Sequence, residues 1–128
     1  MIVVADTHAW LWWVADRSKL SRAAKRALAR ADRIAVSPIS AWEIAMLVLR
    51  GRLRLDTEVR AWVTAAVEAD RVELAPLTAD VAVTAASLSA LHADPADRII
   101  VATALENRAP LVTRDAAIAA SKTVKCVW

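Results

Sequence analysis

The chain has 128 residues, of which 58% are hydrophobic. This length suffices for one hydrophobic core and is too short for two, so we expect a single domain over residues 1–128. No charge-free stretch approaches the roughly 18–20 residues of a membrane helix, and the first residues lack the basic region of a signal peptide. We therefore expect a cytoplasmic protein without membrane association. The single cysteine, Cys126, can form no internal disulfide and is expected to pack as a small hydrophobe.

The formal net charge is +3, from 17 basic and 14 acidic residues. The basic residues gather in two groups, one from Arg17 to Arg33 and one from Arg50 to Arg54. Basic surface of this kind suits a polyanion such as RNA, although ordinary solvated helix faces explain either group alone about as well. The candidate RNA contacts are Arg17, Lys19, Arg22, Arg50 and Arg52.

Short apolar runs alternate with longer amphipathic segments along the whole chain. In chain order, the first half predicts a strand at 1–5, a helix opening at Thr7, a helix at 18–31, a strand at 33–37 and helices at 40–49 and 56–69. The second half predicts a strand at 72–75, helices at 78–91 and 95–107, a strand at 111–113, a short helix at 115–121 and a strand at 123–127. This alternation predicts an α/β domain whose parallel sheet is covered by helices on both faces.

The segment from His92 to Ala104 combines a helix start with two acids. Asp94 fits the N-cap, Pro95 fits the first helical position, and Asp97 fits the third, near the positive end of the helix dipole. The residues that follow are apolar on nearly every side, so this acidic helix start faces a core rather than open water. An acidic cluster in such a place suggests a bound cation.

Acids also follow three of the predicted strands. Asp6 follows the first strand, Glu43 the second and Asp115 the fourth. Helices that follow parallel strands begin at the carboxyl edge of the sheet. The helix that starts at Pro95 must run antiparallel to the next strand, which returns Asp97 to the same edge. Open α/β sheets bind their ligands at this edge.

Each acid also has a purely structural explanation. Ser40 and Glu43 fit a capping box, whereas Asp6, Asp94 and Asp115 fit N-caps, and for Asp94 the cap is the better explanation. Acids from four remote segments held at one edge would nevertheless raise one another's pKa and destabilise the fold unless a cation lay among them. Carboxylates without a cluster of Cys or His favour Mg²⁺ or Mn²⁺ over zinc.

Four motifs together resemble a known family. They are DTHAW from Asp6, SPISAWEI from Ser37, DPADRIIVATA from Asp94 and LVTRD from Leu111. In this order and spacing, and over essentially the whole chain, they resemble the PIN-domain family, specifically the VapC toxins of bacterial type II toxin–antitoxin pairs. The resemblance implies a PIN-like fold with a five-stranded parallel sheet in the order 3-2-1-4-5. It also implies Mg²⁺-dependent endoribonuclease activity, a homodimer and inhibition by a small VapB-type antitoxin.

Carried over position by position, the resemblance also implies an acidic quartet that is both catalytic and metal-binding: Asp6, Glu43, Asp97 and Asp115. It implies that Thr113 is the hydroxyl neighbour of this quartet. Asp94 is expected to support the ligands without binding the ion itself. We expect Arg98 to pair with the carboxylates and order them rather than to contact phosphate.

The expected reaction is metal-assisted hydrolysis of RNA phosphodiester bonds. The ion would be held by Asp6 and Asp97, with Glu43 or Asp115 bound directly or through water. It would lower the pKa of a bound water and polarise the phosphate, and the sequence leaves one and two ions equally open.

The histidines and tryptophans add further candidates. His8 and His92 could each act as a general base, although packing in an apolar helix better explains His8. Six tryptophans in so small and apolar a chain are more than one core is expected to hide. Core packing is the plainer explanation for any one of these tryptophans, but we expect the helix with Trp10, Trp12 and Trp13 to supply part of an exposed groove for a second copy or a partner helix.

Two other protein classes share parts of this pattern. A receiver domain of two-component signalling has a parallel sheet and an acidic Mg²⁺ site, but it needs an Asp at the end of the third strand, where this chain has Glu73, Leu74, Ala75 and Pro76. A catalytically silent module would keep the fold and use the basic patches to hold RNA or protein. The presence of all four acids argues against this second alternative.

Overall fold

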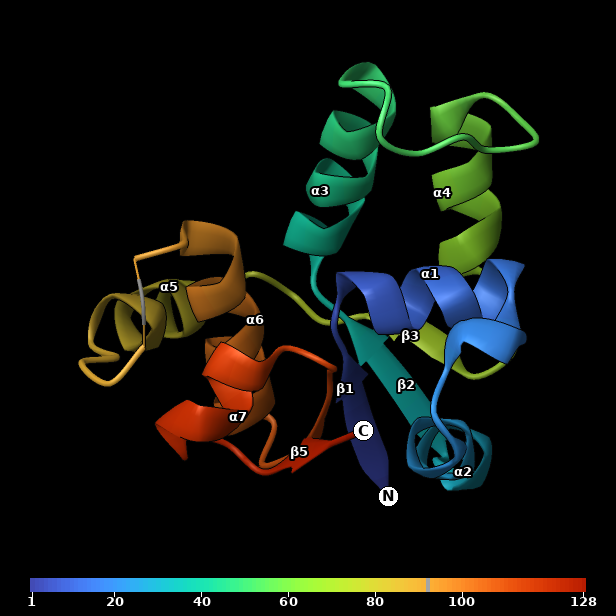
Figure 1. The fold of residues 1–128 in the computed structure, drawn as a ribbon. Helices are drawn as coiled ribbons and strands as arrows, with labels where there is room; N and C mark the ends of the chain where they lie inside the picture. Colours follow the sequence, from blue (N-terminus) through green and yellow to red (C-terminus); the bar gives the residue numbers. More distant parts are fainter. Residues whose placement is uncertain (92) are drawn as a thin grey trace.

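A computed structural model describes residues 1–91 and 93–128 of the chain, and Figure 1 shows a central parallel sheet flanked by helices. The elements are β1 (Ile2–Ala5), α1 (Thr7–Ala15), the 3₁₀ turn η1 (Arg17–Lys19), α2 (Arg22–Arg30), β2 (Arg33–Val36), α3 (Pro38–Leu49), α4 (Val59–Val67), β3 (Val72–Leu74), α5 (Ala79–Ala86), α6 (Pro95–Glu106), β4 (Leu111–Val112), α7 (Ala116–Ser121) and β5 (Cys126–Val127).

The strand order is β3-β2-β1-β4-β5, with every neighbouring pair parallel. This order confirms the arrangement that the family resemblance implied. The central strand β1 places Val3 beside Ile34 of β2 and Val4 beside Leu111 of β4. Receiver domains use the order 2-1-3-4-5, so the topology excludes that alternative class.

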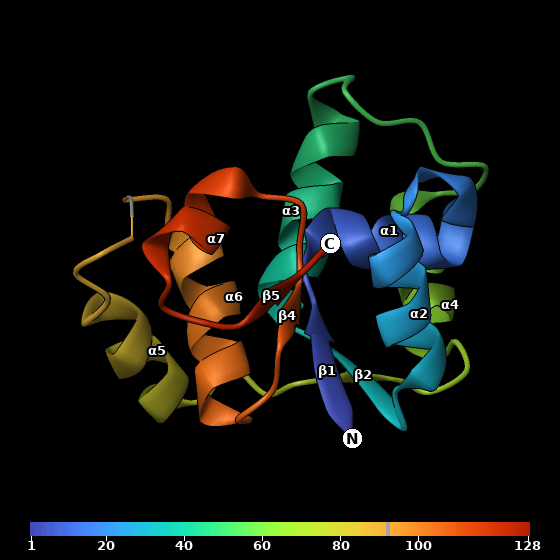
Figure 2. The same cartoon turned by 60° about the horizontal axis from the view of Figure 1, so that its bottom comes forward.

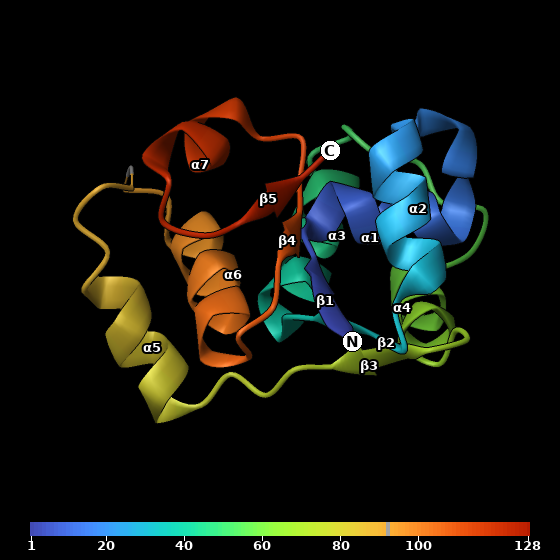
Figure 3. The same cartoon turned by 90° about the horizontal axis from the view of Figure 1, so that it is seen from below.

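The sheet separates two apolar cores. Side chains alternate between the two faces of a strand, so Val3 and Ala5 pack into the core beneath α1, α2 and α4, whereas Val4 packs into the core beneath α6. Figures 2 and 3 show these two groups of helices on opposite sides of the strands. Among residues 1–91 and 93–128, no helix has the length and apolarity that crossing a bilayer requires.

Local capping moved two of the predicted helix starts. The helix expected over 18–31 is a 3₁₀ turn followed by α2, because the Ser21 hydroxyl accepts a hydrogen bond from the Ala24 amide at 3.0 Å and fixes the start there. α3 begins at Pro38, because the Ser37 hydroxyl caps it by accepting from the Ile39 amide at 3.2 Å. The predicted capping box of Ser40 and Glu43 is therefore wrong.

Three other elements are shorter than predicted. The helix predicted at 56–69 begins at Val59, because the Glu58 carboxylate accepts hydrogen bonds from the amides of Arg60 and Ala61. The helix predicted to reach residue 91 ends at Ala86, and the last strand covers only Cys126–Val127. These short ends leave the layer order of the domain unchanged.

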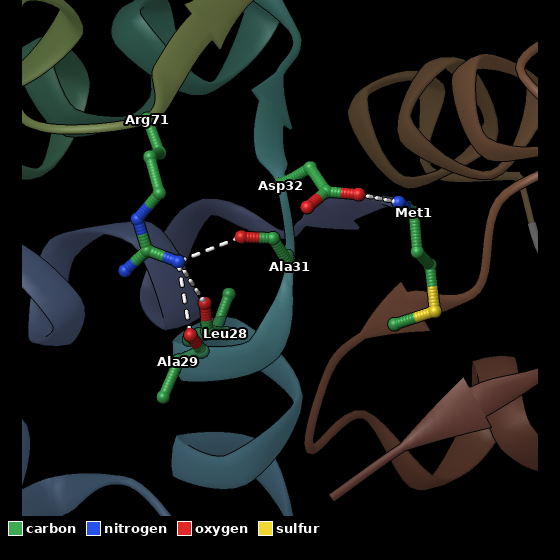
Figure 4. Close-up of polar contacts among 6 residues, drawn as sticks. All are labelled: Met1, Leu28, Ala29, Ala31, Asp32 and Arg71. Atoms are coloured by element: carbon green, nitrogen blue, oxygen red, sulfur yellow. Dashed lines mark hydrogen bonds and ion pairs between the residues drawn. The ribbon is translucent and has the colours of Figure 1, made fainter.

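Arg71 joins the start of β3 to the end of α2 (Figure 4). Its Nη1 atom donates to the carbonyl oxygens of Ala31 at 2.6 Å, Ala29 at 2.9 Å and Leu28 at 3.4 Å. Carbonyls at the end of a helix lack partners within the helix, so this guanidinium acts as their cap. The same figure shows an ion pair between the Met1 amino group and Asp32, just before β2.

Replacing Arg71 by alanine is expected to lower the free energy of unfolding by about 1–3 kcal/mol, because three carbonyls at the end of α2, two of them in part-buried bonds, would lose their donor. The left-handed backbone at residue 71, with φ of 61°, is equally strained for arginine and alanine, so the change isolates the side chain. Urea unfolding followed by tryptophan fluorescence measures the effect. Arg33→Ala is the control, since it removes only an exposed 3.2 Å pair with Glu73. Equal destabilisation by the two changes would contradict the capping role.

Candidate active site

A cleft of about 510 Å³ lies at the carboxyl edge of the sheet. Its walls come from the segments after β1 and β4, from α3 and from the start of α6. The acids that line it are Asp6, Glu43, Asp94, Asp97 and Asp115. The fold therefore brings together all the acids that the sequence placed at this edge.

Asp6 is the most deeply placed of these acids. One carboxylate oxygen accepts a hydrogen bond from the Ala9 amide at 2.8 Å and caps α1, and the other accepts from the Thr113 hydroxyl. Burial raises the pKa of Asp6 above its ordinary value of 3.8, and the charge of Asp115 raises it further, while the hydrogen bonds from Thr113 and Ala9 act in the opposite direction. A nearby cation would stabilise the charged form of this side chain.

Glu43 faces the same cleft from the second turn of α3. Its carboxylate accepts a hydrogen bond from the Thr7 hydroxyl, which also contacts the Ser40 hydroxyl at 2.9 Å. Burial raises the pKa of Glu43, and the charges of Asp94 and Asp6 raise it further. Thr7 is a site residue that the sequence predicted only as the start of a helix. Its position directly after Asp6 in the first motif is the signal that could have revealed it.

Asp94 and Asp115 combine a structural and a site position. Asp94 caps α6 by accepting from the amides of Ala96 at 2.9 Å and Asp97 at 3.3 Å. Asp115 caps α7 in the same way, and its own amide donates to the Thr113 hydroxyl at 3.1 Å. Both acids are therefore helix caps and, at the same time, lining residues of the cleft.

Arg98 has contacts that the sequence did not predict. We expected it to order the carboxylates, but its guanidinium donates to the carbonyl oxygens of Ala85 at 3.0 Å, Ala86 at 3.1 Å and Leu91 at 3.1 Å. These bonds fasten the end of α5 to the first turns of α6, which carries Asp97. Through these bonds Arg98 acts on the carboxylates only indirectly, because it positions the helix that carries Asp97.

Of the two histidines predicted as candidate general bases, the structure describes only His8. His8 lines the acidic cleft, and its ring lies 5.3 Å from that of Trp12. Burial lowers the pKa of His8, and the charge of Asp6 raises it, so the ring combines a packing contact with a position beside the acids. The other candidate base, His92, lies outside the described residues.

The donor set fits a divalent cation by its chemistry. Carboxylates are the ligands that Mg²⁺ and Mn²⁺ prefer, and burial makes the charge on Asp6 and Glu43 costly without a cation. Within residues 1–91 and 93–128, no group of three or more acidic, histidine or cysteine side chains is arranged so that it could already hold a metal ion. The acids therefore line an open cleft rather than a finished coordination sphere.

The family model for the PIN domain matches residues 3–122 of the chain. The chain belongs to the PIN-domain family. This PIN domain is 41% identical, over 114 residues, to Ribonuclease VapC22 of Mycobacterium tuberculosis, with 88% of this chain and 86% of the relative covered. The family resemblance inferred from the four motifs is thereby confirmed.

Solved structures share the fold at lower sequence identity. VapBC2 from Rickettsia felis, bound to a DNA fragment of its promoter, matches this PIN domain with a TM-score of 0.69, 17% identity and coverage of 98% of this chain and 97% of that one. VapBC-5 from Mycobacterium tuberculosis matches with a TM-score of 0.62, 24% identity and coverage of 98% and 96%. These likenesses concern the fold.

The basic candidates of this PIN domain lie in two places. Arg50 lines an apolar groove of about 450 Å³ that shares His8, Glu43 and Asp94 with the acidic cleft. Arg17, by contrast, follows the far end of α1, where its guanidinium lies 3.6 Å from the centre of the Trp13 ring. Lys19 and Arg22 follow in η1 and α2, and Arg52 lies just beyond α3, so the fold does not gather the basic candidates around the acids.

The prediction of an exposed tryptophan surface on α1 is wrong. Trp10, Trp12 and Trp13 have only 0%, 8% and 5% of their surface exposed, because they belong to the core that α1 shares with the sheet, α2 and α4. Trp10 donates to the Ala66 carbonyl at 3.2 Å and packs edge-on against Trp62. The tryptophan exposed beside the cleft is Trp42 on α3, at 55%.

Proposed function

We propose that this PIN domain is a divalent-metal-dependent endoribonuclease that hydrolyses RNA phosphodiester bonds, and that it is the toxin of a type II toxin–antitoxin pair. The observation that carries the proposal is the cleft in which Asp6, Glu43, Asp97 and Asp115 come together from four separate segments. The 41% identity to a VapC ribonuclease over most of both chains supports the same activity.

In this proposal Asp6 and Asp97 hold the ion, Mg²⁺ or Mn²⁺, with help from Glu43 and Asp115. A bound ion of this type lowers the pKa of water and polarises a phosphate. The protein's own hydroxyl groups prepare the site, because Thr113 fixes the carboxylate of Asp6 and Thr7 fixes that of Glu43. Their hydrogen bonds orient the charges before any substrate arrives, which lowers the cost of reorganising them during the reaction. Asp94 supports the site from the helix start.

A VapB-type antitoxin is the proposed protein partner, and the groove beside the cleft is its proposed docking place. The groove is lined by Ile39, Trp42, Met46 and Leu47, and it reaches the acidic cleft at Glu43. An apolar segment bound there could extend a Lys or Arg toward the carboxylates and block the site. This groove replaces the buried α1 tryptophans as the partner surface.

Homodimerisation is also part of the proposal. Val83 on α5 is 67% exposed, and Leu77, just before that helix, is 46% exposed. Neither residue lines the proposed antitoxin groove, so this apolar surface is separate from it. Sedimentation of the isolated chain measures the oligomeric state.

Expression of the chain alone, with and without the small protein encoded by the neighbouring reading frame, tests the proposed function. The chain alone is expected to arrest growth, and the purified protein is expected to cut RNA. Co-expression of the neighbouring protein, if it has a DNA-binding half, is expected to restore growth. A purified, partner-free chain that leaves structured and unstructured RNA intact with Mg²⁺ or Mn²⁺ present would contradict the ribonuclease assignment.

A further inference from the structure

Arg114 is a cation inside the acidic cleft. It lies between β4 and α7, directly before Asp115, and it lines the cleft together with Asp6 and Glu43. Its side chain is exposed to solvent. The sequence motifs predicted no role for this residue. A positive charge fixed at this place has consequences for any anion that approaches the four carboxylates.

The guanidinium of Arg114 rests on an aromatic support. Its Cζ atom lies 4.5 Å from the centre of the Trp12 ring, which is a favourable cation–π distance. Trp12 is only 8% exposed and is itself packed between neighbours, with the His8 ring at 5.3 Å and the Trp128 ring at 5.9 Å. Figure 2 shows the end of the chain returning beside α1, as this last contact requires. The support is therefore held by two segments, α1 and the end of the chain.

Among the described residues, Arg114 forms no direct ion pair with the acids around it. Within the part of the chain that the structure describes, the ion pairs join Met1 to Asp32, Arg33 to Glu73 and Arg71 to Asp70, and none involves Arg114. An arginine that stacks through its face keeps its N–H groups at the edge of the plane, where they can bind a phosphate through two hydrogen bonds.

We propose that Arg114 binds a backbone phosphate of the RNA and holds the strand against the four carboxylates. The proposal rests on the ribonuclease function proposed above. The cleft acids repel a polyanion, so a fixed cation at their edge gives the substrate a point of attachment beside the reacting site. Trp12 acts as a positioning residue, because it sets the direction of the guanidinium without touching the RNA.

The test is a binding experiment with an RNA that is not cut. The parent protein is the Asp97→Asn variant, and the probe is a fluorescein-labelled single-stranded RNA followed by anisotropy over a series of salt concentrations. Arg114→Ala in this parent is expected to weaken binding about tenfold and to reduce the slope of log K against log salt by about 0.7, the loss of one phosphate contact. Arg114→Lys is expected to keep the slope and recover only part of the affinity, because lysine binds phosphate as a point charge.

Arg108→Ala is the matched control. Arg108 is an exposed arginine just after α6, at the opposite end of that helix from Asp97. Its replacement by alanine therefore removes the same charge far from the cleft. We expect it to leave both affinity and slope unchanged. In the wild-type background, Arg114→Ala should also raise the KM for RNA cleavage more than it lowers kcat, and its melting temperature should stay close to that of the wild type.

Several outcomes would overturn the assignment of Arg114. Unchanged affinity and salt slope in Arg114→Ala would do so, as would an equal loss in Arg108→Ala, which would show that only total charge matters. A wild-type protein that cuts RNA while Arg114→Ala cuts it equally well would remove this inference and keep the proposed function. A wild-type protein that neither cuts nor binds RNA would remove both.

Discussion

Asp97→Asn is expected to lower kcat/KM for RNA cleavage by about a hundredfold or more while the domain stays folded. The change preserves the shape of the side chain but removes its charge and a carboxylate oxygen from the cleft, and loss of a metal ligand costs at least as much as loss of a supporting residue. The hydrogen bond from the Asp97 amide to Asp94 uses the backbone and survives the substitution. Because one of several crowded acids becomes neutral, the metal-free variant is expected to be as stable as the wild type or slightly more stable.

Asp94→Asn is the matched control for this prediction. Asparagine caps helices as well as aspartate does, so the bonds from the amides of Ala96 and Asp97 can be kept. The variant should retain most of its activity. Steady-state cleavage of a labelled RNA by both variants decides the question. An equal loss of activity in the two would show that Asp94 is needed as much as Asp97 and that the liganding acid was wrongly assigned.

Removal of divalent cations is expected to abolish RNA cleavage. EDTA should stop the reaction, and excess Mg²⁺ or Mn²⁺ should restore it, because the carboxylates cannot by themselves attract a phosphate or activate water. Cleavage that proceeds equally well in chelator would contradict the metal-dependent mechanism. A chelator-treated sample that regains activity only with zinc would instead show that the donor set had been wrongly assigned.

Removing or adding the divalent cation is also expected to change the stability of the fold, and this effect can be measured without an activity assay. Burial raises the pKa of Asp6 and of Glu43, so the folded protein holds protons that the unfolded chain has already released. These bound protons stabilise the folded protein. Their contribution to the free energy of unfolding is fully present below the ordinary pKa values of 3.8 and 4.5, and it is lost as the pH rises through the raised pKa values. At neutral pH, Mg²⁺ or Mn²⁺ should therefore raise the melting temperature, and the gain should shrink toward pH 4. Thermal melts with and without the ion at several pH values measure this difference.

Sequence periodicity was enough to determine the α/β architecture and the meeting of the acids. An apolar run such as Ile2 to Ala5, followed by a polar helix start, is best buried as a strand of a parallel sheet. The acid at the helix start then lies at the carboxyl edge of that sheet. Asp6 and Asp115 could be placed for this reason, since Asp6 directly follows β1 and Asp115 comes shortly after the end of β4 at Val112. The arrival of Asp97 at the same edge followed from the direction of α6, which a short turn before β4 dictates.

Only the tertiary structure decided which apolar and charged side chains remain available. Trp12 and Trp42 are equally hydrophobic in sequence, but Trp12 packs between His8 and Trp128 at the end of the chain, whereas Trp42 lines an open groove beside α3. One tryptophan is therefore hidden and the other is exposed. Arg98 and Arg114 each stand beside an acid in the chain. Arg98 caps α5, and Arg114 rests on Trp12. Contacts of this kind join segments that are remote in sequence, and periodicity carries no information about them because it reports only which face of one element is apolar.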